Sequence, residues 1–227
     1  MHKVGRRGIC FRTLNEIVRR HEALRTHFAM VDGTPVQIIA PHLELELPLT
    51  DLADLPHGER EARAQWLAED EAQTPFDLST GPLIRAGLIR LDDNDHIILL
   101  TLHHIVSDGW SMGVLVQEVA ALYTAYVEKQ PSPLAELAIQ YADFAHWQRQ
   151  WLSGDVLAQQ LAYWQKQLTG APTLLALPTD RPRPAVQSYR GATLPFTISA
   201  ETTQGAAAHL LQQVVECAAA VNLAAQY

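Results

Sequence analysis

The stretch at the centre of this chain reads Leu102-His103-His104-Ile105-Val106-Ser107-Asp108-Gly109-Trp110-Ser111. It continues a nearly unbroken apolar run that begins at His96, which predicts a strand covered on both faces. The Asp108-Gly109 pair marks the turn at which this strand ends. Imidazole is the side chain that exchanges a proton near neutral pH without large tuning of its pKa. A histidine at a strand end, followed by Asp-Gly, therefore indicates a fixed proton acceptor rather than core filling.

The flanking sequence predicts strands and helices on both sides of this stretch. Leu83–Leu91 reads as a second strand, joined to the first by Asp92-Asp93-Asn94 in a hairpin. A short strand at Val36–Ile39 follows the Asp32-Gly33 turn. Apolar residues at helical spacing predict helices over 12–27, 59–73, 112–126, 138–152 and 155–169. Strands interleaved with helices, including an antiparallel pair, predict an α/β fold: a mixed sheet with flanking helices.

Composition and charge exclude several functional classes. Of the 227 residues 48% are hydrophobic and 19% are charged, which is typical of a globular protein and excludes wholesale disorder. The net charge of -8 argues against a nucleic-acid surface. A basic cluster, Arg19-Arg20-His21 with Arg25, is interrupted by Glu22. A solvated helix face with one buried pair explains it at least as well as phosphate binding.

The chain has no feature that predicts export or membrane insertion. Its two cysteines, Cys10 and Cys217, are too few for a disulfide framework, which favours a reducing cytoplasm. Met1–Arg12 is basic but lacks the apolar segment of a signal peptide. The longest apolar run, Ile97–Val106, is about half the length that crosses a bilayer. We therefore expect a cytoplasmic protein without a membrane partner.

The paired histidines do not predict a metal site. Neighbouring residues on a strand point to opposite faces, so His103 and His104 cannot both reach one ion. No third or fourth ligand follows at a useful spacing. We expect one histidine to be buried and structural and the other to face a cleft.

A serine hydrolase is the alternative reading of the same stretch. Gly109–Gly113 matches the G-x-S-x-G nucleophile elbow, and Asp180 and His209 follow in the order of a catalytic triad. Against it, Ile105–Gly109 separates the elbow from the strand, and His209 lies in an Ala-rich tail. Ser111 is explained more simply as a helix N-cap.

Two further segments of the chain, one before and one after this stretch, also match known sequence patterns. Arg20–Phe28 fits the pattern RHExLRTxF, and Tyr141–Gln148 fits YxDFAxWQ. With the HHxxxDG signature at His103–Gly109, they resemble the condensation domain of nonribosomal peptide synthetases, in the chloramphenicol acetyltransferase-like superfamily. Leu177–Pro184 is similar to the family's crossover region. The likeness runs from about Leu14 to Ile198.

This resemblance implies an acyltransferase, in which an acceptor aminoacyl thioester attacks a donor acyl thioester through its amine. It implies that His104 is the base or orienting residue and that His103, Asp108 and Gly109 support the loop. Arg25 is then the expected ionic partner of Asp108. The aromatic residues of the motifs are expected to pack the lobe rather than touch substrate: Trp110, Tyr141, Phe144 and Trp147.

The implied partners are carrier proteins and an adjacent adenylation domain. The carrier proteins supply phosphopantetheine arms, and no cofactor is expected to be bound to this chain itself.

The resemblance covers one of the two lobes that build such a domain. We expect 1–11 to be an unmatched segment, 12–170 the N-terminal lobe, 171–200 a Pro-rich crossover and 201–227 an Ala-rich start of a truncated second lobe. The family's opening S-x-A-Q-x-R region and the motifs of the second lobe are absent from the sequence. A non-catalytic remnant or a carrier-protein docking module therefore stands as a further alternative.

Overall fold

The computed structural model describes residues 3–175, 178, 182, 184–186 and 195–198. The chain divides into two compact units, Met1–Thr169 and Gly170–Tyr227, and the helices and strands described below lie in the first. In chain order they are α1 (Lys3–Arg20), the 3-10 helix η1 (Glu22–Arg25), β1 (Thr26–Val31), β2 (Thr34–Ile39), β3 (Leu49–Asp51), α2 (His57–Gln73), β4 (Ile84–Arg90), β5 (His96–Leu102), α3 (Gly109–Val127), α4 (Tyr141–Trp151) and α5 (Gly154–Leu168). The predicted Ala-rich tail and parts of the predicted Pro-rich crossover lie outside the described residues.

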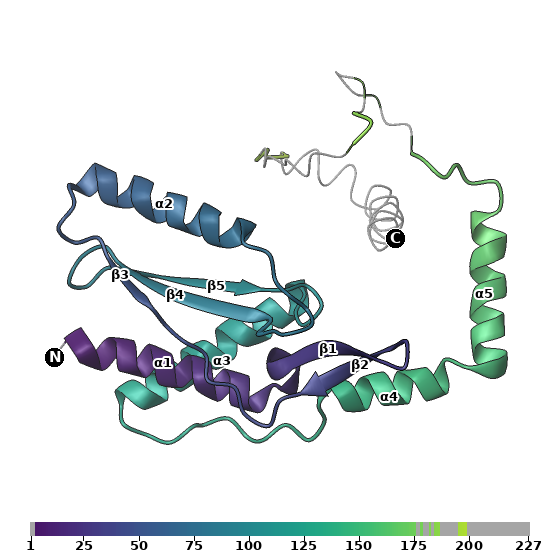
Figure 1. Ribbon diagram of the computed structural model, residues 1–227, viewed down its shortest axis with the longest axis horizontal. Helices are drawn as coiled ribbons and strands as arrows, with labels where there is room; N and C mark the ends of the chain where they lie inside the picture. The colour runs from purple at the N-terminus through teal and green to yellow at the C-terminus, as the bar shows by residue number, and fades with distance from the viewer. Residues whose placement is uncertain (1–2, 176–177, 179–181, 183, 187–194, 199–227) are drawn as a thin grey trace. The chain divides into compact units, whose positions relative to one another are not determined.

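A three-stranded sheet with helices on both faces forms the centre of this first unit (Figure 1). The strand order is β3-β4-β5, with β3 parallel to β4 and β4 antiparallel to β5. α2 packs on one face, and α1 and α3 pack on the other. The predicted α/β fold and the predicted hairpin of two central strands are confirmed.

The alternation of side chains along β4 explains why the sheet is covered on both sides. Ile84 and Leu88 pack in one cluster with residues of α1 and α3, whereas Ile89 packs with Ala64 of α2. The expectation of complete cover is wrong for β5. As the edge strand of the sheet, β5 leaves Ile97 and Ile98 exposed.

The first helix differs from the predicted range 12–27 at both ends. α1 begins at Lys3 and ends at Arg20, after which His21 is extended (φ -103°, ψ 101°). A tertiary contact ends it, because Gln140 Nε2 donates a 2.8 Å hydrogen bond to the Arg20 carbonyl that a longer helix would use itself.

The next segment forms a separate hairpin rather than helix. β1 pairs with β2 in antiparallel register, from Thr26 opposite Ile39 to Val31 opposite Thr34. Asp32 and Gly33 connect the strands with positive φ angles of 50° and 75°, as the tightest hairpin turns require. The predicted strand at 36–39 is confirmed as the second half of this hairpin.

The two predicted helices at the end of the unit are present as α4 and α5. α4 begins at Tyr141, later than predicted, because the backbone N–H of extended Gln140 donates to Asp143 Oδ2 at 2.9 Å. Four aromatic residues follow along α4 with neighbouring ring centroids 5.5–6.0 Å apart: Tyr141, Phe144, Trp147 and Trp151. The prediction that the motif aromatics pack the lobe is wrong, since these rings contact one another along the helix and, like Trp110, remain exposed.

Leu122 tests the packing of α3 on the sheet. Its side chain is fully buried, so Leu122→Ala should lower the free energy of unfolding by about 2–5 kcal/mol through lost burial and a residual cavity. Val116→Ala on the same helix is the control, because Val116 is 64% exposed and should change stability by less than about 0.5 kcal/mol. Urea unfolding measures both; equal losses would contradict the packing described here.

Candidate active site

The candidate site is the loop that leaves β5 and enters α3. His103, the first residue after the strand, is half-buried, and its backbone N–H donates to the Leu83 carbonyl at 3.0 Å. Its Nδ1 accepts a 3.0 Å hydrogen bond from the Ile105 N–H. Its ring meets Phe76 edge-on, with centroids 5.8 Å apart, and the Arg85 guanidinium covers Phe76. These contacts hold the turn that carries His104.

His104 is exposed and lines a cleft of about 590 Å³. The cleft is bounded by Ala68 and Glu71 of α2, by the edge of β5 and by the loop itself. The predicted difference between the two histidines is present in part: His104 faces a cleft, but His103 is half-buried rather than buried. Both follow β5 rather than continuing it, so a turn and not strand alternation separates them.

Asp108 is the N-cap of α3. Its Oδ1 accepts hydrogen bonds from the Ser111 backbone N–H at 2.8 Å and from the Ser111 hydroxyl at 2.6 Å. These hydrogen bonds lower the pKa of the Asp108 carboxyl, and the charge of nearby His104 adds a smaller effect in the same direction. The prediction that Ser111 is the N-cap is wrong: Ser111 lies in the first turn and donates to the residue that caps it.

Arg25 does not contact Asp108. Its guanidinium donates to the Ala40 carbonyl and, at 3.3 Å, to Glu22. The predicted ion pair is therefore wrong, because Arg25 finds closer partners within its own segment and Asp108 is satisfied by Ser111. Gly109 has no positive φ, and an added Cβ would meet nothing within 4 Å. Neither a left-handed backbone nor crowding therefore explains the glycine at this position.

A buried ionic cluster behind the loop was only partly anticipated. Glu118 of α3 accepts from Arg20 Nη2 at 3.2 Å and bonds His21 Nε2 at 2.8 Å. The side chains of Arg20 and Glu118 are 3% and 12% exposed. Burial acts to raise the pKa of Glu118, but the hydrogen bonds from His21 and Arg20 hold it below its ordinary value. The basic cluster predicted one buried pair, yet nothing in the sequence identified Glu118 as its acid.

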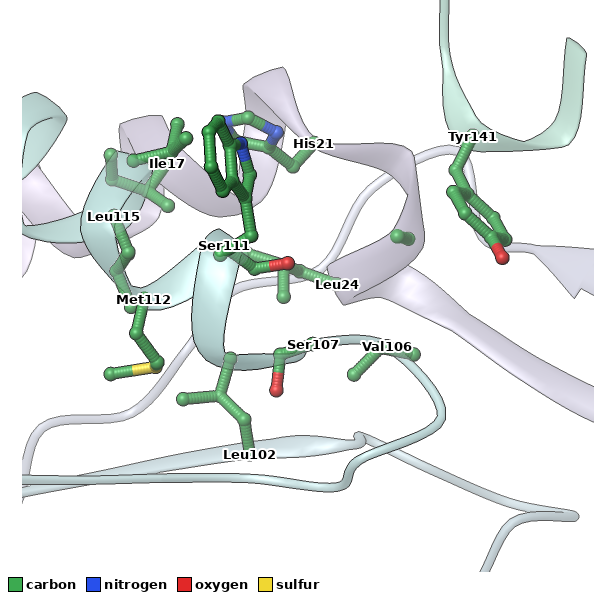
Figure 2. Close-up of a pocket in the computed structure, with 13 residues that line it drawn as sticks. Ile17, His21, Leu24, Leu102, Val106, Ser107, Ser111, Met112, Leu115 and Tyr141 are labelled. Atoms are coloured by element: carbon green, nitrogen blue, oxygen red, sulfur yellow. The ribbon is translucent and has the colours of Figure 1, made fainter. Parts of the chain in front are cut away.

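A second, apolar cavity of about 260 Å³ lies beside the loop (Figure 2). Ile17, Leu24 and Leu115 form its buried floor, and Trp110 and Tyr141 form exposed walls. It shares Leu102, Ser107 and Met112 with the cleft of His104.

The hydrolase alternative finds little support in this geometry. The Ser111 hydroxyl donates to a carboxylate and to no histidine. The other two residues of that triad, Asp180 and His209, lie outside the described residues. The described part of the chain contains no group of three or more His, Cys, Asp or Glu residues placed to hold a metal ion. It also contains no helix long and apolar enough to span a membrane.

Comparison with known proteins gives a consistent result. The family described as Condensation domain matches residues 10–220. A linear gramicidin synthase from Brevibacillus parabrevis is 53% identical over 190 residues, which are 84% of this chain and 4% of that protein. Malpibaldin synthetase of Mortierella alpina is 50% identical over 193 residues, which are 85% of this chain and 4% of that protein.

A solved structure agrees in fold. The epimerization domain from the third module of a tyrocidine synthetase superposes with a TM-score of 0.70 and 29% identity, over 89% of this chain and 45% of that one. This chain therefore spans a small fraction of its curated relatives and less than half of the solved domain.

The cap at Asp108 predicts a pH dependence of stability. Asp108→Ala should lower the melting temperature at pH 7. Because the folded-state pKa of Asp108 is depressed, its contribution is complete above the ordinary value of 3.8 and is lost as the pH falls through the lowered value. The two proteins should therefore converge in acid, as measured by circular dichroism melts. Asp54→Ala is the control, since exposed Asp54 bonds no other described side chain. A difference in melting temperature between the wild type and Asp108→Ala that persists in acid would contradict the role of Asp108 as cap.

The ionic cluster predicts a large stability loss. Glu118→Gln leaves the Arg20 guanidinium buried without a counter-charge, which should cost about 3–5 kcal/mol in urea unfolding. Glu136→Gln removes one of the two acidic partners of exposed Arg19, the other being Glu16, and should leave the free energy of unfolding nearly unchanged. If the two substitutions lower the free energy of unfolding by similar amounts, the buried cluster contributes no more to stability than the exposed ion pair.

Proposed function

Because this chain belongs to the condensation-domain family, we propose that it contributes the base-bearing lobe of a peptide-bond-forming acyltransferase of nonribosomal peptide synthesis. The observation that carries the proposal is the state of His104. Its imidazole faces the cleft, while the neighbouring polar groups of the loop bond one another. Family membership and this exposed imidazole support the same chemistry.

The proposed reaction transfers an acyl group from sulfur to nitrogen. The amine of an acceptor aminoacyl thioester attacks the carbonyl of a donor thioester, so that a C–N bond forms and the C–S bond breaks. The amine loses a proton as it attacks, and the departing thiolate gains one. His104 takes the first proton and returns it to sulfur, which leaves the imidazole unchanged after each turnover.

The supporting residues hold this imidazole in place. His103 fixes the turn through its ring nitrogen and its contact with Phe76. Asp108 fixes the start of α3, and Gly109 lines the same cleft as His104. Arg25 acts indirectly. Its guanidinium donates to the carbonyl of Ala40, the residue after β2, and this hydrogen bond fixes η1 against the end of that strand.

Both thioesters are proposed to arrive on phosphopantetheine arms of carrier proteins, with an adenylation domain as a neighbour in the same assembly. A cytoplasmic location follows from this proposal and from the two-cysteine composition. Tethering both thioesters at one base would add a proximity effect to the proton transfer.

The experiment places residues 10–220 in the condensation domain of the linear gramicidin synthase, replacing the matching segment, and measures dipeptidyl thioester formation. His104→Ala should slow the reaction by about 10²–10⁴-fold. Ser111→Ala is the matched control and should retain most of the rate. Equal rates with and without His104 would remove it from the chemistry. A loss at Ser111 with His104 dispensable would favour the hydrolase alternative.

The unaltered 227-residue chain should be assayed beside the chimera. Activity in the chimera and none in the chain alone would fit a lobe that needs a second lobe. Failure of both, with the fold intact by circular dichroism, would favour the non-catalytic alternative.

A further inference from the structure

The apolar cavity beside the catalytic loop has no part in the proton transfer described above. Its floor is made of side chains that are 1–8% exposed: Ile17, Leu24 and Leu115. Figure 2 shows Ile17, His21 and Leu115 on one side of the space and Leu102, Val106 and Ser107 on the other. The exposed rings of Trp110 and Tyr141 extend the walls toward solvent. The result is a hydrophobic recess that is open at one end.

Most polar groups at this recess are already satisfied within the protein. His21 Nε2 bonds Glu118 Oε2, and the Ser111 hydroxyl donates to Asp108. A ligand in the recess therefore gains nothing from polar groups of its own, and an apolar group suits it best. Ser107 is different, because its hydroxyl bonds no other described residue and it lines both the recess and the His104 cleft.

We propose that this recess, bounded by Val114, Trp110 and Tyr141, binds the side chain of a bulky apolar aminoacyl thioester, leucine-like or phenylalanine-like, whose reacting group lies by His104. This inference rests on the proposed function, because it names the substrate class of that same site. The two cavities adjoin at Leu102, Ser107 and Met112, and the proposal has one substrate reach from the cleft into the recess there. Ser107 then bonds the polar backbone of the substrate at the junction.

The size of the recess agrees with this occupant. Its volume of about 260 Å³ exceeds the roughly 30 Å³ that one water occupies in the liquid several times over. An isobutyl or benzyl group fits within such a space, whereas glycine leaves it to water. Burying such a group is worth about a tenfold change in affinity or more.

The test uses the full 227-residue chain and three stable probes: the pantetheine amides of L-phenylalanine, L-leucine and glycine. Titration followed by ¹H–¹⁵N spectra gives a dissociation constant for each probe and maps the shifted residues. We expect the phenylalanyl and leucyl probes to bind at least about tenfold more tightly than the glycyl probe, with shifts at Ser107 and Val114.

Matched variants on α3 separate the recess from nonspecific effects. Val114→Trp fills the recess and should abolish the preference for the large side chains, while Val116→Trp, on the same helix but outside the recess, should keep it. Ala23→Leu fills the recess from η1 and provides a second test should the first variant lose its fold. Ser107→Ala should weaken all three probes by about two- to tenfold without changing their ratio.

The outcomes separate this inference from the proposed function. Equal affinities for the three probes, no binding of the phenylalanyl probe, or equal behaviour of Val114→Trp and Val116→Trp would overturn the recess as a side-chain site. Dipeptide formation in the chimera that depends on His104 would then still support the acyltransferase. A preference of about tenfold without any His104-dependent transfer would support the recess and reject the proposed reaction.

Discussion

The carboxylate of Glu118 fixes the arrangement on which the rest of this unit depends. It holds Arg20 and His21 at the end of α1, and Arg20 in turn donates to the Ala135 carbonyl at 2.7 Å. A charge buried this deeply is costly unless it is paired and hydrogen-bonded, so the three segments cannot shift independently. The chain leaves α1 at His21 because Gln140 bonds the Arg20 carbonyl and the Glu22 N–H, which are backbone groups that would prolong the helix. α3, which carries Glu118 in its middle and Asp108 at its start, is thereby anchored to α1 behind the loop.

The sequence predicts the elements whose causes lie within a few residues. The Asp32-Gly33 turn, the pairing of β4 with β5 and the helices on either side all follow from local spacing and turn residues. The end of α1 does not, because Gln140, which closes it, is 120 positions away in the chain. β3 escaped prediction for a similar reason, since three residues carry too little periodicity and only pairing with β4 makes Leu49–Asp51 a strand.

The candidate site shows the same division between local and distant causes. The different exposure of His103 and His104 was expected from alternation along a strand, but a turn after β5 produces it. The choice of His104 as the accessible imidazole came from the resemblance. The sequence predicted the wrong N-cap residue for α3. Asp108 and Ser111 lie three positions apart and are both good N-cap residues, so only the backbone angles decide between them. The expected Arg25–Asp108 pair came from the resemblance. A resemblance gives the types and order of residues, but it does not show which partners each side chain contacts. Both residues bond groups that lie nearer to them in the chain.

The loop therefore combines two roles in one short motif: some of its residues hold the backbone in place, and others remain accessible to a substrate. Its backbone is made rigid by internal bonds: Ile105 to His103 at one end and Ser111 to Asp108 at the other. These bonds occupy the polar groups that would compete for a substrate, and they leave His104 on the cleft side and Ser107 between cleft and recess. Asp108 caps α3, and the first turn of this helix forms a wall of both cavities. Movement of that turn would alter the position of His104 and the shape of the recess together, so the proposed proton transfer and the proposed side-chain recognition would be coupled through one helix cap.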